Sequence, residues 1–375
     1  MTRLYCLLLL ALLAVPSEAQ TVTRIGSVAT LDVAAWNIRQ FQTGDPQMAH
    51  VVATMEQSGV DLWALQEVTS SAVLSALLSR LGDEWDGRLS TSSNLYSAFV
   101  FRKDVISIRS VGPMFSSGQF SYEFAGRPPF VLDANVTVGG QTVQMMFVTL
   151  HMKCCSDNTS FERRQDASTA MKNRLDFLHT SDWLVVLGDF NDETERSITF
   201  GKPSPYANFV SDAEYDFLIS DGVVGTFCGS DSRCRTGSTI DNILVSSEVA
   251  PTLVAGSADR YSELLTELPS YTSSTSDHLP VVARFDLAAS TAAEVLPSTG
   301  TLAEVWPQPV RESLNVRLAE PARIEIWDIL GRRVMVIDSP AGPSRMDLGA
   351  LSPGLYLLRT IAKTSVSSRP IVIGR

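Results

Sequence analysis

Apolar and polar positions alternate along the chain so that strands and helices are predicted in turn from about residue 30 to residue 287. Short apolar runs predict strands at 30–38, 60–68, 96–104, 130–138, 142–152, 182–190, 241–247 and 279–287. Apolar residues at helical spacing predict helices at 48–58, 72–81 and 161–178. Strands with interleaved helices predict two mixed sheets packed together, with the helices on the outside.

The pattern changes after residue 287. Residues 288–300 are poor in large apolar side chains and rich in Ala, Ser and Thr, which predicts a linker. Beyond it, the stretches SLNVRLA, ARIEIWDIL, RRVMVID and GLYLLRTIA alternate with turn residues and show no helical period. This pattern predicts a small C-terminal all-β domain over residues 301–375, an immunoglobulin-like sandwich.

The N-terminus has the pattern of a secretory signal peptide over residues 1–19. Arg3 gives a positive start, an unbroken apolar run covers 7–15, and Ser17 and Ala19 are small residues at the positions that a signal peptidase reads. The run is too short to favour the alternative, a transmembrane anchor. We therefore expect an exported protein without a transmembrane segment after signal removal, whose first domain covers residues 20–287.

Composition and charge narrow the function classes. The 375 residues are 45% hydrophobic and 19% charged, which excludes a disordered protein. A formal net charge of −11 counts against generic binding of polyanions, so a nucleic-acid substrate would require a local basic patch or bound cations. Basic residues do gather at 151–174, but acidic residues stand among them, and a solvated helix face of mixed charge is the favoured interpretation.

Besides Cys6 in the signal segment, the sequence holds Cys154, Cys155, Cys228 and Cys234. Export makes disulfides possible. Cys228 and Cys234 enclose a short loop and are the first choice for a pair. The adjacent Cys154 and Cys155 are left open between a vicinal bridge, two free thiols and pairing with the other two. Metal binding is the rival interpretation, but no histidine lies at zinc-finger spacing.

Polar side chains able to bind a metal ion or a phosphate stand at an end of nearly every predicted strand of the first domain. They are Asn37, Glu67, His151, Asp189, Asn191, Asp241, Asp277 and His278. Strands that carry such groups to one rim of a sheet build a convergent polar site. Carboxylate and amide oxygens suit Mg²⁺, Mn²⁺ or Ca²⁺ better than zinc, and the two histidines supply proton transfer near neutral pH.

The segments AAWNIRQF, LQEV, TLH, GDFND, STIDNILV and SDHLP occur in this order between about residues 30 and 287. In order and rough spacing they resemble the motifs of the endonuclease/exonuclease/phosphatase family, which implies the DNase I-like four-layer α/β sandwich. NIRQF and GRPPF resemble DNase I within that family. The inositol-phosphatase signature is absent, and His151 stands where abasic-site endonucleases usually carry a tyrosine.

The resemblance implies roles for the candidate residues. Glu67, together with Asn37 and Asp277, holds the principal divalent cation. Arg127, in the GRPPF segment, contacts a phosphate of the substrate.

The remaining candidates act, by the same resemblance, on the scissile phosphate and its water. His278, oriented by Asp241, acts as the base or binds the scissile phosphate. Asp189 and Asn191 position the water and the phosphate, with room for a second metal. His151 protonates or stabilises the leaving oxygen.

The C-terminal segments WPQPVRESLNVRL, ARIEIWDILGRRV and MDLGALSPGLYLLR resemble the C-terminal sorting domain of type IX (Por) secretion. The resemblance implies passage through two bacterial membranes, with the type IX secretion machinery as a partner. Removal of the domain or attachment at the cell surface follows. A generic immunoglobulin-like accessory domain that binds carbohydrate is the alternative.

Together these features predict a secreted or cell-surface, divalent-metal-dependent phosphodiesterase, an endonuclease that hydrolyses DNA, RNA or both. A sphingomyelinase-like phospholipid phosphodiesterase shares nearly all the metal-binding and histidine residues. An exposed aromatic hairpin would favour that alternative, and the stretch 114–124 shows no clear one. A non-catalytic adhesin or scaffold is the third interpretation, and the completeness of the acid, amide and histidine set counts against it.

Overall fold

The computed structural model describes residues 21–374 except for 91–94, 179–182, 221, 223, 230, 236, 289–302, 308, 329–331 and 363–365. The predicted signal peptide and nearly all of the predicted linker therefore lie outside the described residues. Among the helices that are described, none is long and apolar enough to cross a membrane.

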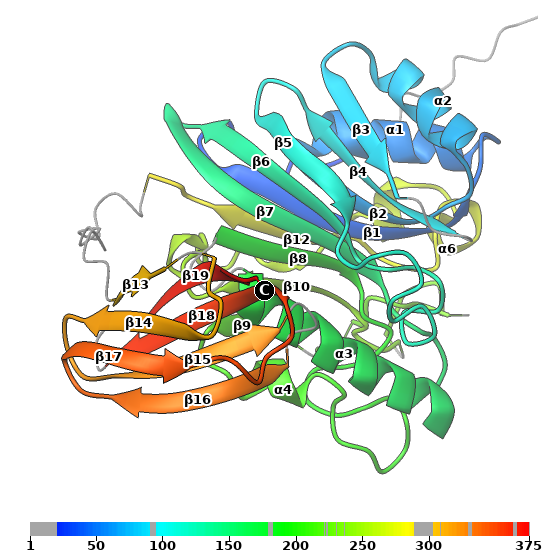
Figure 1. The fold of residues 1–375 in the computed structure, drawn as a ribbon. Coiled ribbons are helices and arrows are strands. Elements are labelled where there is room, and N and C mark those ends of the chain that lie inside the picture. Colours follow the sequence, from blue (N-terminus) through cyan, green and yellow to red (C-terminus); the bar gives the residue numbers. More distant parts are fainter. Residues whose placement is uncertain are drawn as a thin grey trace, which may run out of the picture.

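The first domain contains two six-stranded sheets (Figure 1). The first sheet consists of β1 (Leu31–Phe41), β2 (Leu62–Val68), β3 (Trp85–Leu89), β4 (Tyr96–Arg102), β11 (Asp259–Arg260) and β12 (Val281–Phe285). The second consists of β5 (Ile106–Pro113), β6 (Phe130–Val138), β7 (Gln141–His151), β8 (Trp183–Asp189), β9 (Tyr215–Phe217) and β10 (Asp241–Ser246). Their strand orders are β11-β12-β1-β2-β4-β3 and β5-β6-β7-β8-β10-β9.

Each sheet has one parallel pair, β1 with β2 and β7 with β8, and the other neighbours are antiparallel. Parallel neighbours need a long crossover connection. The helices α1 (Gln47–Ser58) and α3 (Asn158–Leu178) supply these two crossovers. The carboxyl ends of four strands are thereby directed to one rim of the two sheets, which is where ligands bind in such arrangements.

The helices cover the outer faces of the sheets. Helices α1 and α2 (Ser71–Leu81) lie on the first sheet, and α3 lies on the second (Figure 1). Alternate residues of β1 explain the layers: Val33 packs between the sheets, whereas Ala34 and Trp36 pack toward α1 and α2. Because both faces are buried, these strands are apolar at nearly every position. The predicted arrangement of two packed mixed sheets with outer helices is confirmed.

Several elements differ from the sequence prediction. Strand β1 does not end at Asn37 but continues to Phe41 through an irregularity in its pairing with β2. Strands β3, β5, β9 and β11 lack the apolar runs that predict strands, since they are short or lie at sheet edges. The remaining short helices are α4 (Ala207–Val210), η1 (Ala250–Thr252), α5 (Leu264–Glu267) and α6 (Tyr271–Ser274).

The C-terminal region is all-β, as predicted. It comprises β13 (Ala303–Trp306), β14 (Ser313–Leu318), β15 (Ala322–Asp328), β16 (Arg333–Ser339), β17 (Gly342–Asp347), β18 (Gly354–Ala362) and β19 (Val366–Ile373). Antiparallel sheets of order β13-β14-β17 and β16-β15-β18-β19 enclose one core that includes Leu314, Ile324 and Leu358. Strand β17 (GPSRMD) escapes prediction because it contributes Met346 alone to that core.

A buried pair of carboxyl groups near the start of β1 and β2 makes stability depend on pH. Asp61 accepts a hydrogen bond from the Asp32 backbone N–H at 2.9 Å. Burial, and to a lesser extent the Asp32 carboxylate, raises the pKa of Asp61 from 3.8 to about 7. The folded protein therefore holds a proton that the unfolded chain has lost above pH ~4, so stability falls as pH rises from about 4 to 7.

Asp61→Asn should weaken this dependence, because the amide keeps an oxygen for the Asp32 N–H and cannot ionise. A smaller dependence remains, since burial also raises the pKa of Asp32 to about 6. At pH 8 the variant should be more stable than the wild type by on the order of 2 kcal/mol. Below pH 4 the two proteins should melt alike. Thermal melting of both proteins between pH 4 and 8 is the measurement. An equal pH dependence in wild type and variant would show that Asp61 ionises as freely in the fold as in the unfolded chain.

Candidate active site

A cavity of about 760 Å³ opens at the rim where the parallel strands of both sheets end. Seven of the nine residues predicted from the sequence line it, and they come from both sheets and from the loop before β12. They are Asn37, Glu67, His151, Asp189, Asn191, Asp277 and His278. The other two, Arg127 and Asp241, are not among the lining residues and act on residues that are.

Strand register explains why residues far apart in sequence meet here. In the second sheet His151 of β7 pairs with Asp189 of β8, and Asp189 pairs with Asp241 of β10. The β7–β8 approach is possible only because residue 188 is glycine, since a Cβ there would lie 2.2 Å from the Leu150 carbonyl oxygen. Three titratable side chains on three adjacent strands are thus brought to one level.

The first sheet contributes Asn37 and Glu67 through an unusual backbone. Arg39, Gln40 and Glu67 have φ values of 44°, 47° and 63°, in the left-handed region that non-glycine residues rarely adopt. This turn aims the Arg39 N–H at Asn37 Oδ1 (3.0 Å) and the Gln40 N–H at Glu67 Oε2 (2.9 Å). The side-chain amide of Asn37 donates to Glu67 Oε1 (3.3 Å) and Asp189 Oδ2 (2.9 Å), which joins the two sheets.

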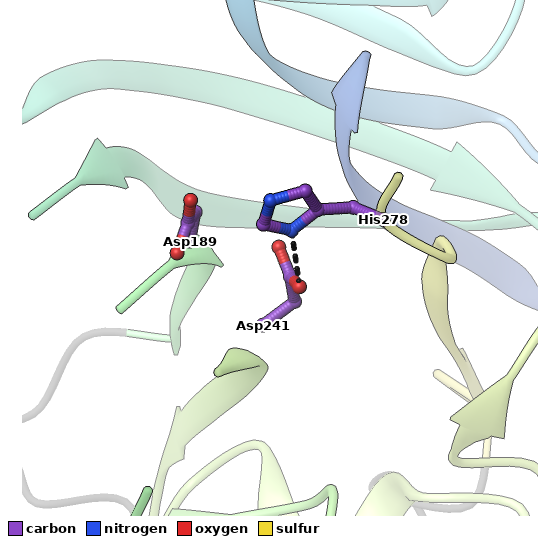
Figure 2. A group of neighbouring side chains, drawn as sticks. All are labelled: Asp189, Asp241 and His278. Atoms are coloured by element: carbon purple, nitrogen blue, oxygen red, sulfur yellow. Dashed lines mark hydrogen bonds and ion pairs between the residues drawn. The ribbon is translucent and has the colours of Figure 1, made fainter. Parts of the chain in front are cut away.

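His278 and Asp241 form a buried pair on one side of the cavity. The His278 Nδ1 atom lies 2.8 Å from Asp241 Oδ2, and the other ring nitrogen points away from Asp241 (Figure 2). Burial alone would lower the pKa of His278, but the carboxylates of Asp241, Asp189 and Asp277 together raise it to about 10. In this arrangement Asp241 orients the imidazole and stabilises its positive charge.

His151 has the opposite electrostatic surroundings. Its Nε2 atom lies 3.6 Å from Asp189 Oδ2 and 4.0 Å from Glu67 Oε1, and only 5% of its side chain is exposed. Burial, with a smaller effect of the Arg127 guanidinium, holds the pKa of His151 well below 6.5. The surroundings of the two imidazoles thus shift their pKa values in opposite directions, that of His151 downward and that of His278 upward.

Burial and the neighbouring Asp241 carboxylate raise the pKa of Asp189 to about 7. Its Oδ1 atom accepts the Asn191 backbone N–H at 2.9 Å, and Asn191 itself has a left-handed φ of 54°. The Asn191 side-chain amide donates to the Met152 carbonyl at 3.2 Å. Asp189 is thus fixed in position by hydrogen bonds while like charges surround it.

The sequence model of the Endonuclease/Exonuclease/phosphatase family matches residues 34–278, which is more than half of the chain. The matched segment includes all nine predicted site residues. The chain belongs to the endonuclease/exonuclease/phosphatase family. It is therefore a hydrolase of the metal-dependent phosphoesterase type. None of the curated proteins matches the sequence significantly.

Solved structures share the family's fold at low sequence identity. The 3′ phosphatase NExo from Neisseria, bound to a product DNA hairpin, has a TM-score of 0.52 at 17% identity, with 68% of this chain and 99% of that chain covered. A family protein from Bacteroides vulgatus has a TM-score of 0.50 at 18% identity, covering 68% and 98%. TDP2 of D. rerio, complexed with a single-strand DNA product, has a TM-score of 0.50 at 14% identity, covering 68% and 99%. The DNase I-like fold is confirmed.

Residues 304–374 match the secretion system C-terminal sorting domain. The resemblance of the C-terminal segments to this domain is confirmed. The domain indicates a bacterial protein that is secreted or held at the cell surface, and it implies the type IX secretion machinery as a partner.

Members of this family are metal-dependent phosphoesterases, and the donor atoms of the cavity suit a divalent cation. Carboxylate and amide side chains line it, and such oxygen atoms are the ligands that hard divalent cations prefer. Among the described residues Asp189, Asp241 and His278 also offer ligand atoms within 4.8 Å of one another.

Arg127 forms hydrogen bonds to the backbone at the end of β7. Its Nε atom donates to the His151 carbonyl at 3.2 Å and its Nη2 atom donates to the Met152 carbonyl at 2.9 Å. Burial lowers the pKa of its guanidinium. In the structure Arg127 thus holds the end of β7 and the backbone of His151, and a contact with substrate phosphate stays a prediction.

Sequence reasoning missed residues that hold the catalytic candidates in place. The Thr226 hydroxyl oxygen accepts the backbone N–H of Asp241 at 2.9 Å. The Ser276 hydroxyl donates to the Asn37 carbonyl at 2.6 Å and accepts the His278 N–H at 3.0 Å. Ser276 belongs to the SDHLP motif, so its place in the sequence was a reason to consider it. Nothing in the sequence around Thr226 indicated that this residue lies near the site.

The predicted disulfide between Cys228 and Cys234 is present and supports this side of the cavity. The Cys228 backbone N–H donates to the Asp277 carbonyl at 2.7 Å, and Phe227 forms a β-bridge with His278. The closed loop therefore fixes the backbone of the segment that presents Asp277 and His278. Cys154 and Cys155 are free thiols that also line the cavity.

Proposed function

We propose that this phosphoesterase is an extracellular endonuclease that hydrolyses phosphodiester bonds of DNA or RNA. The observation that carries the proposal is one open cavity that combines the oxygen set of Asn37, Glu67 and Asp277 with the Asp241–His278 pair. Hydrolysis of a phosphodiester needs charge neutralisation, an activated water and a stabilised leaving oxygen, and these groups supply all three. Two similarly folded proteins, NExo and TDP2, were solved with DNA products.

In this proposal Glu67, Asn37 and Asp277 hold the cation, which is Mg²⁺ or Mn²⁺, with Ca²⁺ as a third candidate. The bound cation supplies charge stabilisation for the phosphoryl oxygens. Its binding also offsets the repulsion among the carboxylates. Arg39, whose Nε atom lies 3.6 Å from Asp277 Oδ2, adds positive charge at the mouth of a site that belongs to an acidic protein.

The proton-transfer roles follow from the side-chain geometry. Asp241 holds Nδ1 of His278. While His278 is protonated, its other ring nitrogen donates to the scissile phosphate; once it has lost that proton, the same nitrogen acts as base toward water. Asp189 and Asn191 position the water and the phosphate. His151, whose Nε2 atom lies 3.6 Å from Asp189 Oδ2, stabilises or protonates the leaving oxygen.

We also propose the domain limits given by the sequence pattern. The catalytic domain covers residues 20–287 after a signal peptide at 1–19, and a linker at 288–300 leads to the sorting domain at 301–375. All nine candidate residues precede the linker. The sorting domain therefore serves export and surface attachment and takes no part in hydrolysis.

A substrate panel with purified mature protein tests the proposal: plasmid DNA, RNA, sphingomyelin and a phosphate monoester, each with and without Mg²⁺ or Mn²⁺. We expect cation-dependent cleavage of DNA, RNA or both, and little activity on the other two substrates. His278→Ala protein is the matched control for contaminating nucleases. Preferential hydrolysis of sphingomyelin would favour the phospholipid alternative, and hydrolysis of the monoester alone would make the protein a phosphatase.

A further inference from the structure

Two adjacent free thiols form part of the wall of the active-site cavity. Cys154 and Cys155 are both exposed and both line the cavity, a few residues beyond His151 at the end of β7. Their Sγ atoms lie 2.8 Å apart. Cys228 and Cys234 are bonded to each other, so each thiol of the pair has the other as its available partner among the described cysteines.

A buried arginine holds the backbone on both sides of this pair. Arg164 of α3 and Asp192 form an ion pair at 2.8 Å in which both side chains are fully buried. The Nη1 atom of Arg164 donates to the carbonyls of Lys153 and Cys155, each at 2.8 Å. Cys155 is kept at a left-handed φ of 86°. Since the flanking carbonyls are fixed, the two sulfur atoms stay close together and any change at the pair remains local.

Lys153 is the charged group in contact with the pair. Its Nζ atom lies 3.1 Å from the Cys154 carbonyl oxygen and 3.4 Å from Cys154 Sγ. The structure thus places an ammonium group against Cys154 Sγ and a second thiol within reach of it.

We propose that Cys154 and Cys155 close reversibly into a vicinal disulfide, and that closure releases the Lys153 ammonium to bind anionic substrate at the cavity wall. The first half concerns the thiols alone. The second half rests on the proposed phosphodiester substrate.

The chemistry is thiol–disulfide exchange with an external disulfide, such as oxidised glutathione or a disulfide oxidoreductase of the export pathway. The Cys154 thiolate attacks one sulfur of the oxidant, which forms a mixed disulfide and releases one thiolate. Cys155 loses its proton, its sulfur attacks Cys154 Sγ, and the second thiolate leaves. The protein loses two electrons and two protons, and the oxidant becomes two thiols.

Chain geometry makes such a bond easy to reverse. Adjacent Cα atoms are about 3.8 Å apart, whereas ordinary disulfides join Cα atoms at least about 4.4 Å apart. The ring formed by neighbouring cysteines is therefore strained, and strained exposed disulfides are the labile ones. The Cys228–Cys234 bond also joins Cα atoms that are close, 4.1 Å apart, but both of its cysteines are buried. Since exchange requires access to the sulfur atoms, we expect this bond to remain closed under the same mild reduction.

Closure should affect substrate binding more than the chemical step. Because Arg164 fixes the flanks, the ring must be accommodated by the Cys154–Cys155 peptide itself, including the Cys154 carbonyl that contacts Lys153. Closing the Sγ–Sγ distance from 2.8 Å to the length of a bond, about 2 Å, also moves Cys154 Sγ relative to the ammonium. Lys153 then loses both of its contacts next to the cavity, and an exposed ion pair with a phosphate becomes available to it.

Tryptic mass mapping of the full-length protein after equilibration in ratios of reduced to oxidised glutathione tests the first half. Cleavage after Lys153 gives the peptide CCSDNTSFER, which contains both thiols. We expect it to become lighter by two hydrogen atoms under oxidising ratios and to regain them on reduction. A peptide that stays a dithiol, or that carries only bound glutathione, would overturn the proposal.

Two readouts on the same samples test the release of Lys153. Acylation of the Lys153 amine should be faster in the oxidised form, and this readout needs no substrate. With an oligonucleotide substrate, oxidation should lower KM about twofold to fivefold, as expected for one exposed ion pair, with kcat unchanged within twofold. Equal acylation in both redox forms would refute the release. If neither form cuts the oligonucleotide, the nuclease proposal fails while the thiol result stands.

Matched variants separate this pair from the other disulfide. Cys154→Ser and Cys155→Ser retain the Cys228–Cys234 bond, so both should hydrolyse substrate like reduced wild type and should not respond to glutathione. Lys153→Gln should still form the vicinal disulfide but show the same KM in both redox states. A redox response that persists in Cys154→Ser would assign the effect to Cys228–Cys234 instead.

Discussion

Removal of divalent cations is expected to abolish phosphoester hydrolysis, with a loss of about 10³-fold or more, because the phosphoryl charge then has no cation to stabilise it. Chelator should eliminate activity, and Mg²⁺ or Mn²⁺ should restore it. Activity of Glu67→Gln should still depend on the divalent cation, but the apparent affinity for that cation should be reduced at least tenfold. Both carboxylate oxygens of Glu67 accept hydrogen bonds from N–H groups. In the variant, the NH₂ group of the glutamine would face one of these donors and could not accept its hydrogen bond.

Metal titration of activity in wild type and variant is the measurement. Glu56→Gln is the matched control, since Glu56 lies exposed on α1 and contributes nothing to the cavity. The control should bind metal and turn over substrate like the wild type. Full activity in excess chelator would contradict a metal-dependent mechanism for this chain.

His278→Ala should lower turnover by about 10²- to 10⁴-fold, the usual contribution of one positioned acid or base. The substitution removes the imidazole and leaves the Asp241 carboxylate buried without its partner. Some loss of stability is therefore expected as well, on the order of 1–3 kcal/mol. Turnover and thermal melting must be measured on the same samples, at a temperature well below the melting point of the variant.

His50→Ala separates the two effects. His50 is buried in α1, where its ring contacts Thr275, and it touches none of the site carboxylates. This variant should lose stability but retain normal turnover. If His278→Ala and His50→Ala lost activity in proportion to their stability, His278 would be a structural residue, and the Asp241–His278 pair would leave the proposed mechanism.

The backbone around the site is strained where the cation-binding candidates stand. Arg39, Gln40, Glu67 and Asn191 all adopt left-handed φ values, although none is glycine. Such conformations cost of order 1–3 kcal/mol each and persist only where surrounding contacts hold them. Here the hydrogen bonds to Asn37, Glu67 and Asp189 do so, which keeps the oxygen ligands preorganised before substrate arrives.

The local sequence determined the long helices, most of the buried strands and the identity of the candidate site residues. The spacing of apolar residues predicted the hairpin of β6 and β7 and the three long helices. This spacing can be read from residues that are close together in the sequence. Polar residues at strand ends, such as His151 and Asp189, were recognisable for the same reason. The same local pattern predicted the Cys228–Cys234 bond, since six residues separate these cysteines.

Only the tertiary structure decided which of these residues meet and what else surrounds them. The His151–Asp189–Asp241 row depends on strand register and on Gly188, which are set by packing across the whole sheet. The sequence could not show that Arg127 bonds to backbone carbonyls. It also could not show that Arg164, on a helix of mixed charge, is buried against Asp192 and holds the Cys154–Cys155 loop. These contacts join residues that are distant in the chain, and a pattern of neighbours carries no information about them.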